Sequence, residues 1–82
     1  MEMKAYVKTY LRHFQLDIED VWRCEMCGKF RNIQRLEIHH ILFRSHGGTD
    51  DIDNLAAVCR ECHMKIHDKG VKFKLEDSII QR

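Results

Sequence analysis

Residues 59–67 read CRECHMKIH, a short stretch that joins a pair of cysteines to a pair of histidines. A second cysteine pair, in the CEMC of residues 24–27, lies earlier in the chain. Both pairs have the C-x2-C spacing of a zinc knuckle, and two knuckles supply the four thiolates of a closed tetrahedral site. The intervening residues 28–58 exceed the ~15–20 residues of an ordinary zinc ribbon, so we expect a further structural element between the knuckles. The predicted ligands of one structural Zn2+ are Cys24, Cys27, Cys59 and Cys62.

The length of the chain and the placement of its cysteines predict one small intracellular domain. A chain of 82 residues has a thin core, and domains of this size often add a structural metal or a disulfide. Residues 1–8, MEMKAYVK, contain neither the apolar run nor the cleavage site of a signal peptide. No stretch approaches the ~20 apolar residues of a membrane span. We therefore expect residues 1–82 to form a single cytoplasmic domain with reduced thiols and no membrane partner.

The net charge of +1 does not by itself indicate a nucleic-acid partner. The distribution of charge says slightly more, because basic residues outnumber acidic ones in segment 21–49, while acidic residues concentrate in segments 17–20 and 50–53. A local basic surface of this kind is weak support for DNA binding, since most charged residues are simply solvated.

Hydrophobic periodicity predicts an α+β fold. Apolar residues recur at helical spacing over residues 2–14, and they alternate in part over residues 35–42, as in a strand. The short apolar run at residues 55–58 is suited to pair with that strand. Residues 60–69 are predicted to form a second helix, which Gly70 ends as a C-cap.

Two segments are less regular in pattern. Residues 17–22 favour a short turn before the first cysteine pair, with Trp22 packed beside the zinc site. The tail, residues 71–82, is ambiguous: it contains a pattern typical of a helical turn over residues 76–81, and it also contains an alternation typical of a short strand. That alternation consists of Val71, Phe73 and Leu75.

Four histidines form a second candidate site. His39 and His40 end the first predicted strand, while His63 and His67 lie four residues apart on the second predicted helix. The i, i+4 spacing places two imidazoles on one helix face, where they can grip one ion. Adjacent residues of a regular strand point to opposite faces, so the strand must end, twist or bulge near His40 if both of its histidines are to reach one phosphate. Single histidines at these places would be ordinary packed or surface residues, but their combination points to a metal site.

The order and spacing of these residues resemble the HNH endonuclease family, in its four-cysteine, zinc-containing branch. The matching motifs are IHHI at 38–41, SHGGTDD at 45–51, NL at 54–55, CRECH at 59–63 and His67. The family includes phage and restriction nucleases and has the ββα-metal fold, also called the His-Me finger. The resemblance implies a zinc-stapled β-hairpin and metal-binding helix over residues 24–67. An N-terminal helical segment, residues 1–22, and the tail, residues 71–82, lie outside it.

The resemblance also implies roles for individual residues. His40 corresponds to the general base that activates water, and a neutral imidazole can take that proton at about pH 7. Asn54 corresponds to the middle residue of the motif, and its side-chain carbonyl is expected to bond one nitrogen of His40 and so fix the tautomer. We expect Arg44 and Lys65 to contact DNA phosphates. The expected ligands of a catalytic divalent cation are His39, His63 and His67.

The catalytic ion stays open among Mg2+, Mn2+, Ni2+ and Zn2+. Magnesium prefers oxygen ligands, whereas three imidazoles favour softer ions. Many relatives have Asp at the position of His39, and this departure puts a simple magnesium assignment in doubt.

The predicted function is therefore metal-dependent hydrolysis of DNA, with double-stranded DNA as the partner, in a protein encoded by a bacterium or a phage. One such site cuts one strand, so cleavage of both strands needs a homodimer or two visits, and specificity can come from a phage or restriction protein partner. The alternative is a zinc-stabilised module that binds nucleic acid, or serves phage packaging, without cutting. Such a module would need the cysteines but neither His40 nor Asn54.

Overall fold

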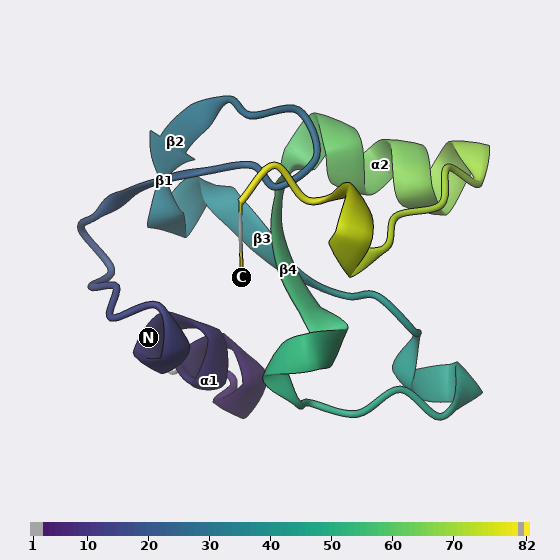
Figure 1. Ribbon diagram of the computed structural model, residues 1–82, viewed down its shortest axis with the longest axis horizontal. Coiled ribbons are helices and arrows are strands. Elements are labelled where there is room, and N and C mark those ends of the chain that lie inside the picture. The colour runs from purple at the N-terminus through teal and green to yellow at the C-terminus, as the bar shows by residue number, and fades with distance from the viewer. Residues whose placement is uncertain (1–2, 81) are drawn as a thin grey trace.

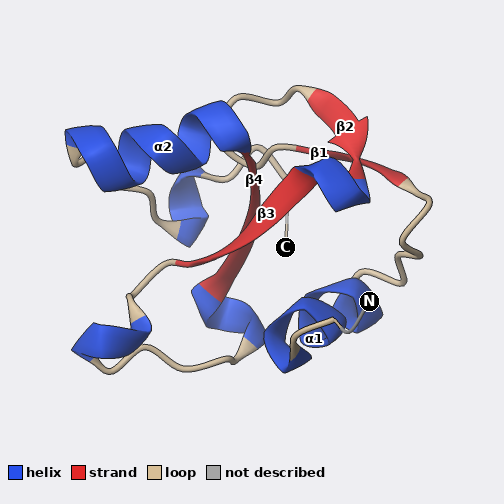
Figure 2. Cartoon of the chain, turned by 180° about the vertical axis from the view of Figure 1, so that it is seen from behind, coloured by secondary structure: helices blue, strands red, loops and turns tan. Residues whose placement is uncertain are grey.

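An antiparallel hairpin, β3–β4, forms the centre of the fold, and both helices pack against it (Figures 1 and 2). The computed structural model describes residues 3–80 and residue 82. A smaller antiparallel hairpin, β1–β2, precedes the central one. The helices and strands in chain order are α1 (Ala5–His13), β1 (Val21–Arg23), β2 (Phe30–Asn32), β3 (Leu36–His40), β4 (Leu55–Cys59) and α2 (Arg60–Lys69). The expected α+β fold, a zinc-stapled β-hairpin with a metal-binding helix and an N-terminal helix, is confirmed.

The register of the central hairpin decides which residues meet. β3 and β4 pair from Leu36 opposite Cys59 to His40 opposite Leu55. Every residue of β4 is buried, because helices cover the hairpin from both sides. Ala57 packs in the cluster that includes α1, whereas Ala56 packs with Ile66 of α2. A strand that is buried on both faces has a continuous apolar sequence, which explains the apolar run before the second cysteine pair.

The second helix has the predicted boundaries, residues 60–69. It begins directly after β4, with Cys59 at the N-cap. It ends at Gly70, which has φ +67°, a left-handed conformation that glycine adopts without the steric cost of a Cβ. Because no loop separates β4 from α2, the position of Cys59 fixes where the helix starts.

The segment before the first cysteine pair differs in part from the prediction. A turn covers residues 17–20, but Val21 then begins a strand rather than continuing the turn. Trp22 packs on α1: its ring lies 5.3 Å from the ring of Phe14, and its Nε1 donates a hydrogen bond to the Tyr10 hydroxyl. Trp22 thus contacts the N-terminal helix and packs against the core cluster that contains Cys24, Cys59 and Cys62, and its place beside a zinc ion stays a prediction.

The tail contains no strand within residues 71–80, so the strand alternative is wrong. Phe73 is buried beside Ile66 and Ala56, and its burial explains the apolar alternation without a sheet. A 3-10 turn covers Leu75–Asp77, earlier than the helical turn expected over residues 76–81. Residue 81, like residue 2 of the first predicted helix, lies outside the described residues. Among those that are described, no helix has the length and apolarity needed to cross a membrane.

A fully buried carboxylate, Glu25, ties four parts of the chain together. One oxygen accepts hydrogen bonds from the Tyr10 hydroxyl at 2.5 Å and the Ala57 N–H at 2.8 Å. The other accepts from the Ser78 hydroxyl at 2.7 Å and from Arg82 at 3.1 Å. Burial, and then the adjacent charge of Glu25, raise the pKa of Tyr10, so this hydroxyl stays a donor. The network joins α1, the first knuckle, β4 and the tail.

We predict that Glu25→Gln lowers the free energy of unfolding by about 3–5 kcal/mol, the usual effect of removing one partner from a buried ion pair. All four partners of the carboxylate are donors, and the amide NH2 of Gln would face two of them. Urea unfolding of the zinc-loaded protein measures the change, with the exposed Glu19→Gln as the control. An unfolding midpoint equal to that of the wild type would show that the network contributes little.

Candidate metal centres and active site

Four cysteines form a compact thiol cluster at the junction of β4 and α2. Their sulfur atoms all lie within 4.8 Å of one another, and the sulfurs of Cys27 and Cys59 are 3.7 Å apart. Cys24 begins a tight turn in which its sulfur accepts hydrogen bonds from the N–H groups of Met26 and Cys27, each at 3.4 Å. Gly28, at φ +83°, completes the turn. The expected four-thiol site is thus brought together, with two ligands from each knuckle.

The electrostatics of the cluster suit a divalent cation. Burial raises the pKa of Cys59 to about 11 and that of Cys62 further. Burial also opposes ionisation of Cys24, but N–H groups from Cys27 and other neighbouring residues outweigh it and lower this pKa to about 7. Several crowded thiolates are costly without a positive charge among them. Four sulfur donors at this separation fit the closed tetrahedral site of structural zinc.

Three imidazoles meet at a second point, on the α2 side of the central hairpin. Ligand nitrogens of His39, His63 and His67 all lie within 4.8 Å of one another. His39 comes from β3, and the other two occupy consecutive turns of α2. The Nε2 atoms of His63 and His67 are 3.0 Å apart, and the ring of Phe43 stacks on His67 at 5.1 Å. The predicted ligand set for a catalytic ion is therefore brought together.

The state of these histidines suits metal binding. Burial, with the neighbouring imidazoles, lowers the pKa of His39 to about 4, so its ring is neutral at about pH 7 and keeps a free lone pair. Glu37 accepts a hydrogen bond from Nδ1 of His63 at 3.1 Å. This bond leaves Nε2 of His63 as the lone-pair nitrogen, and that atom faces the cluster. A carboxylate that orients a metal-binding histidine in this way commonly raises metal affinity.

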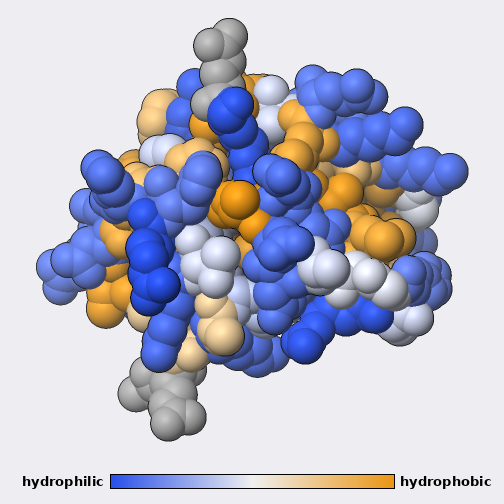
Figure 3. Space-filling view, turned by 60° about the horizontal axis from the view of Figure 1, so that its bottom comes forward, coloured by the Kyte–Doolittle hydropathy of each residue, from blue (hydrophilic) through white to orange (hydrophobic). Residues whose placement is uncertain are grey.

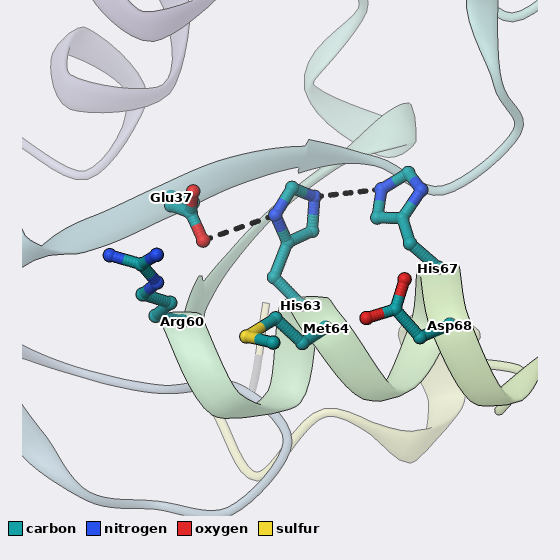
Figure 4. A pocket seen from close by; sticks show the side chains of 6 residues that line it. All are labelled: Glu37, Arg60, His63, Met64, His67 and Asp68. Atoms are coloured by element: carbon teal, nitrogen blue, oxygen red, sulfur yellow. Dashed lines mark hydrogen bonds and ion pairs between the residues drawn. The ribbon is translucent and has the colours of Figure 1, made fainter.

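The cluster opens to solvent through a cavity of about 460 Å3, shown in Figure 4. His63 and His67 line it from one face of α2, and Arg60 lies on the same face one turn earlier. Glu37 reaches toward His63 from β3. Sequence reasoning missed Glu37 and Arg60; their only signal was their spacing from the histidines, two residues before His39 and three before His63.

His40 faces the opposite side of the hairpin, toward α1. Its ring lies edge-on to Tyr6 at 4.5 Å, and its Nε2 is 2.8 Å from Oδ1 of Asp50. A carboxylate oxygen is an acceptor only, so this nitrogen carries the proton. β3 ends at His40, as expected if the strand must stop for both histidines to reach one phosphate.

Asn54 does not bond to His40, and the prediction that it fixes the tautomer is wrong. Its side-chain oxygen accepts from the N–H of Leu42 at 2.7 Å, while its Nδ2 donates to the carbonyls of Leu42 at 3.0 Å and Thr49 at 2.8 Å. Asn54 therefore closes the loop between β3 and β4. The partner of His40 is instead Asp50, from the same loop.

Sequence reasoning missed Asp50, although it lies within the quoted motif at residues 45–51. A charged loop residue has no local signal for a partner ten positions away. Arg44, which we expected to contact a DNA phosphate, is exposed, and its Nε lies 3.8 Å from Oδ1 of Asp50. Lys65 is exposed on α2, two residues from His63 and so turned away from the histidine face.

Comparison with known proteins places this architecture in a family. The HNH endonuclease family matches residues 24–69, more than half of the chain. The chain is 42% identical over 60 residues to the type IV methyl-directed restriction enzyme EcoKMcrA of Escherichia coli K12, a match that covers 65% of this chain and 22% of that enzyme. It is 30% identical over 54 residues to anaredoxin of Nostoc sp. strain PCC 7120, covering 66% of this chain and 68% of that protein. The chain thus belongs to the HNH endonuclease family.

Proposed function

We propose that this chain is a metal-dependent endonuclease that hydrolyses DNA phosphodiester bonds, with His40 as the general base. The observation that carries this proposal is the convergence of three imidazoles from β3 and α2 beside an open cavity. Similarity to a restriction enzyme supports DNA as the substrate. Double-stranded DNA is the proposed substrate. Cleavage of both strands would take two copies of the protein or two successive cleavage events.

The ligand set bears on the choice of cation. Held by His39, His63 and His67, a divalent ion would supply charge stabilisation to the phosphate oxygens in the transition state. Three imidazoles are borderline-soft donors, which favour nickel, zinc or manganese over magnesium. Arg60 lines the same cavity as His63 and His67, and its guanidinium can hold a phosphate oxygen there.

The end of β3 allows one phosphate to be approached from both faces of the hairpin. His39 and His40 are neighbours on opposite faces, and the strand stops at the second of them. A phosphate that lies across this strand end has the cation ligands on one side and the base on the other. The loop that begins at Ile41 must leave room for it, and Asn54 holds that loop in a fixed shape.

Asp50 supports the base by fixing its tautomer. The carboxylate accepts from Nε2 of His40, so Nδ1 is the nitrogen left with a lone pair to take a proton from water. Tyr6 packs against the same ring and limits its rotation. Asp50 is a positioning residue in this scheme, since it acts through His40.

One observation favours a second function, binding of nucleic acid without cleavage. The side chain of His40 is only 12% exposed and already contacts Asp50 and Tyr6, as a purely structural histidine would. In that case the zinc frame would serve as a binding module. Cleavage assays separate the two functions.

We predict that the wild type converts supercoiled plasmid to nicked or linear forms with at least one ion of a panel of Mg2+, Mn2+, Ni2+, Zn2+ and Co2+. His40→Ala should slow cleavage by at least about 100-fold, the usual contribution of a general base. His13→Ala, which removes an exposed imidazole from α1, is the matched control. Rates are compared with protein in excess over plasmid, so that binding differences do not enter.

Plasmid that stays intact with every ion would refute the nuclease proposal, and a gel shift in the same samples would then support the binding module. If His40→Ala cuts as fast as the wild type, the base is another residue.

We predict that Asp50→Asn also slows cleavage by about 100-fold or more, because the Asn amide can donate to Nε2 and so place the proton on Nδ1. Asp51→Asn changes the adjacent acid, whose side chain accepts a hydrogen bond from Thr49 of the same turn, and this variant should cut normally. Nitrogen chemical shifts of the His40 ring report the tautomer directly. An unchanged tautomer and rate in Asp50→Asn would contradict the role given to this carboxylate.

A further inference from the structure

The outer face of α1 carries a row of positive charge that the proposed chemistry does not use. Lys4, the N-cap residue of α1, is followed at intervals of four residues by Lys8 and Arg12 of the helix, so the three line up along one side of it. Residues 3–16 contain no Asp or Glu. All three side chains are exposed, and none forms an ion pair with an acid of the described residues. This basic row, Lys4–Lys8–Arg12, also lies outside the segment that matches the family.

The opposite face of α1 is occupied, which holds the basic row in place. Tyr10 and Leu11 are buried in the main core, and Tyr6, Val7 and Phe14 pack against it. A basic amphipathic helix that binds a membrane must bury its apolar face in lipid, and this face is not free. The basic row is thus a fixed surface feature suited to a polyanion rather than to a bilayer.

The position of α1 places one end of the basic row, Arg12, beside the loop that supports the proposed base. Tyr6 lies 4.5 Å from His40, and Arg12 lines a shallow cavity of about 380 Å3 together with Asp50 and Asp51 of the loop that supports the base. Figure 3, in which the bottom of Figure 1 comes forward, shows a face where hydrophilic residues are interspersed with smaller hydrophobic areas. A duplex with one phosphate at the end of β3 must continue past this helix or past the α2 side.

We propose that Lys4, Lys8 and Arg12 form a second DNA contact, a phosphate-binding row that holds the backbone flanking the cleavage site. Lys4 and Arg12 are separated by about 12 Å along the helix axis, which matches about three phosphates along one strand. The contact carries no sequence information, since it reads charge alone. This inference rests on the proposed function, because it takes DNA as the substrate.

The test compares two variants that lose the same charge. Lys8→Gln/Arg12→Gln removes two members of the row, and Lys69→Gln/Lys72→Gln removes two exposed lysines near the end of α2. Fluorescence anisotropy measures the binding of each zinc-loaded protein to a labelled DNA duplex, without added divalent ion, over a series of NaCl concentrations. Loss of two phosphate contacts should flatten the slope of log K against log[NaCl] by about 1.8. In cleavage assays, Lys8→Gln/Arg12→Gln should raise KM and leave kcat unchanged.

An equal change of slope in both double variants would show that only net charge matters and would overturn the proposal. An unchanged slope in Lys8→Gln/Arg12→Gln would also overturn the proposal. If the wild type still cuts DNA in that case, the proposed nuclease function is unaffected. If the wild type neither binds nor cuts DNA, the proposed function itself fails. Circular dichroism confirms that the variants remain folded, and an affinity loss confined to folded Lys8→Gln/Arg12→Gln supports the row.

Discussion

Four sulfur atoms gathered at the end of β4 are the constraint on which the rest of the structure depends. Two of them, in Cys59 and Cys62, belong to the first turn of α2 or its cap, so the position of the cluster fixes both the start and the direction of this helix. His63 follows at the next residue, and His67 lies one turn beyond. Metal binding to such a cluster can contribute on the order of 10 kcal/mol to folding, far more than the small core of a chain this short can supply.

The two faces of the central hairpin carry different histidines. Adjacent strand residues point in opposite directions, so His39 joins the ligand cluster on the α2 side, while His40 lies against α1. Each helix therefore packs on the face that carries one of the two histidines. α1 supplies the aromatic contact that confines His40, and the buried Glu25 links this helix to the first knuckle. The cysteine cluster, the three-histidine cluster and His40 are thus held by one connected framework.

The parts predicted correctly from sequence are those with local signals. The C-x2-C pairs, the i, i+4 histidines and the cap at Gly70 depend on spacings of a few residues, and each was found where it was expected. The β1–β2 hairpin was missed because strands of three residues leave almost no periodicity to detect. The hydrogen-bond partners of Asn54, Asp50 and Glu25 were missed for another reason. The partner of a polar side chain depends on which groups the tertiary structure places nearby, and local sequence does not contain that information. The tail shows that a local pattern can also mislead. Phe73 is a buried loop residue, and the apolar alternation to which it belongs resembled that of a strand.

The most direct measurement of the central claim is X-ray absorption at the zinc edge, on protein loaded with one equivalent of Zn2+. If the four thiolates hold the start of α2, the spectrum will show four sulfur neighbours at about 2.3 Å and no nitrogen in the first shell. A first shell of nitrogen and oxygen, or of fewer than four sulfurs, would contradict this account, because α2 and its histidines would then lack the frame that positions them.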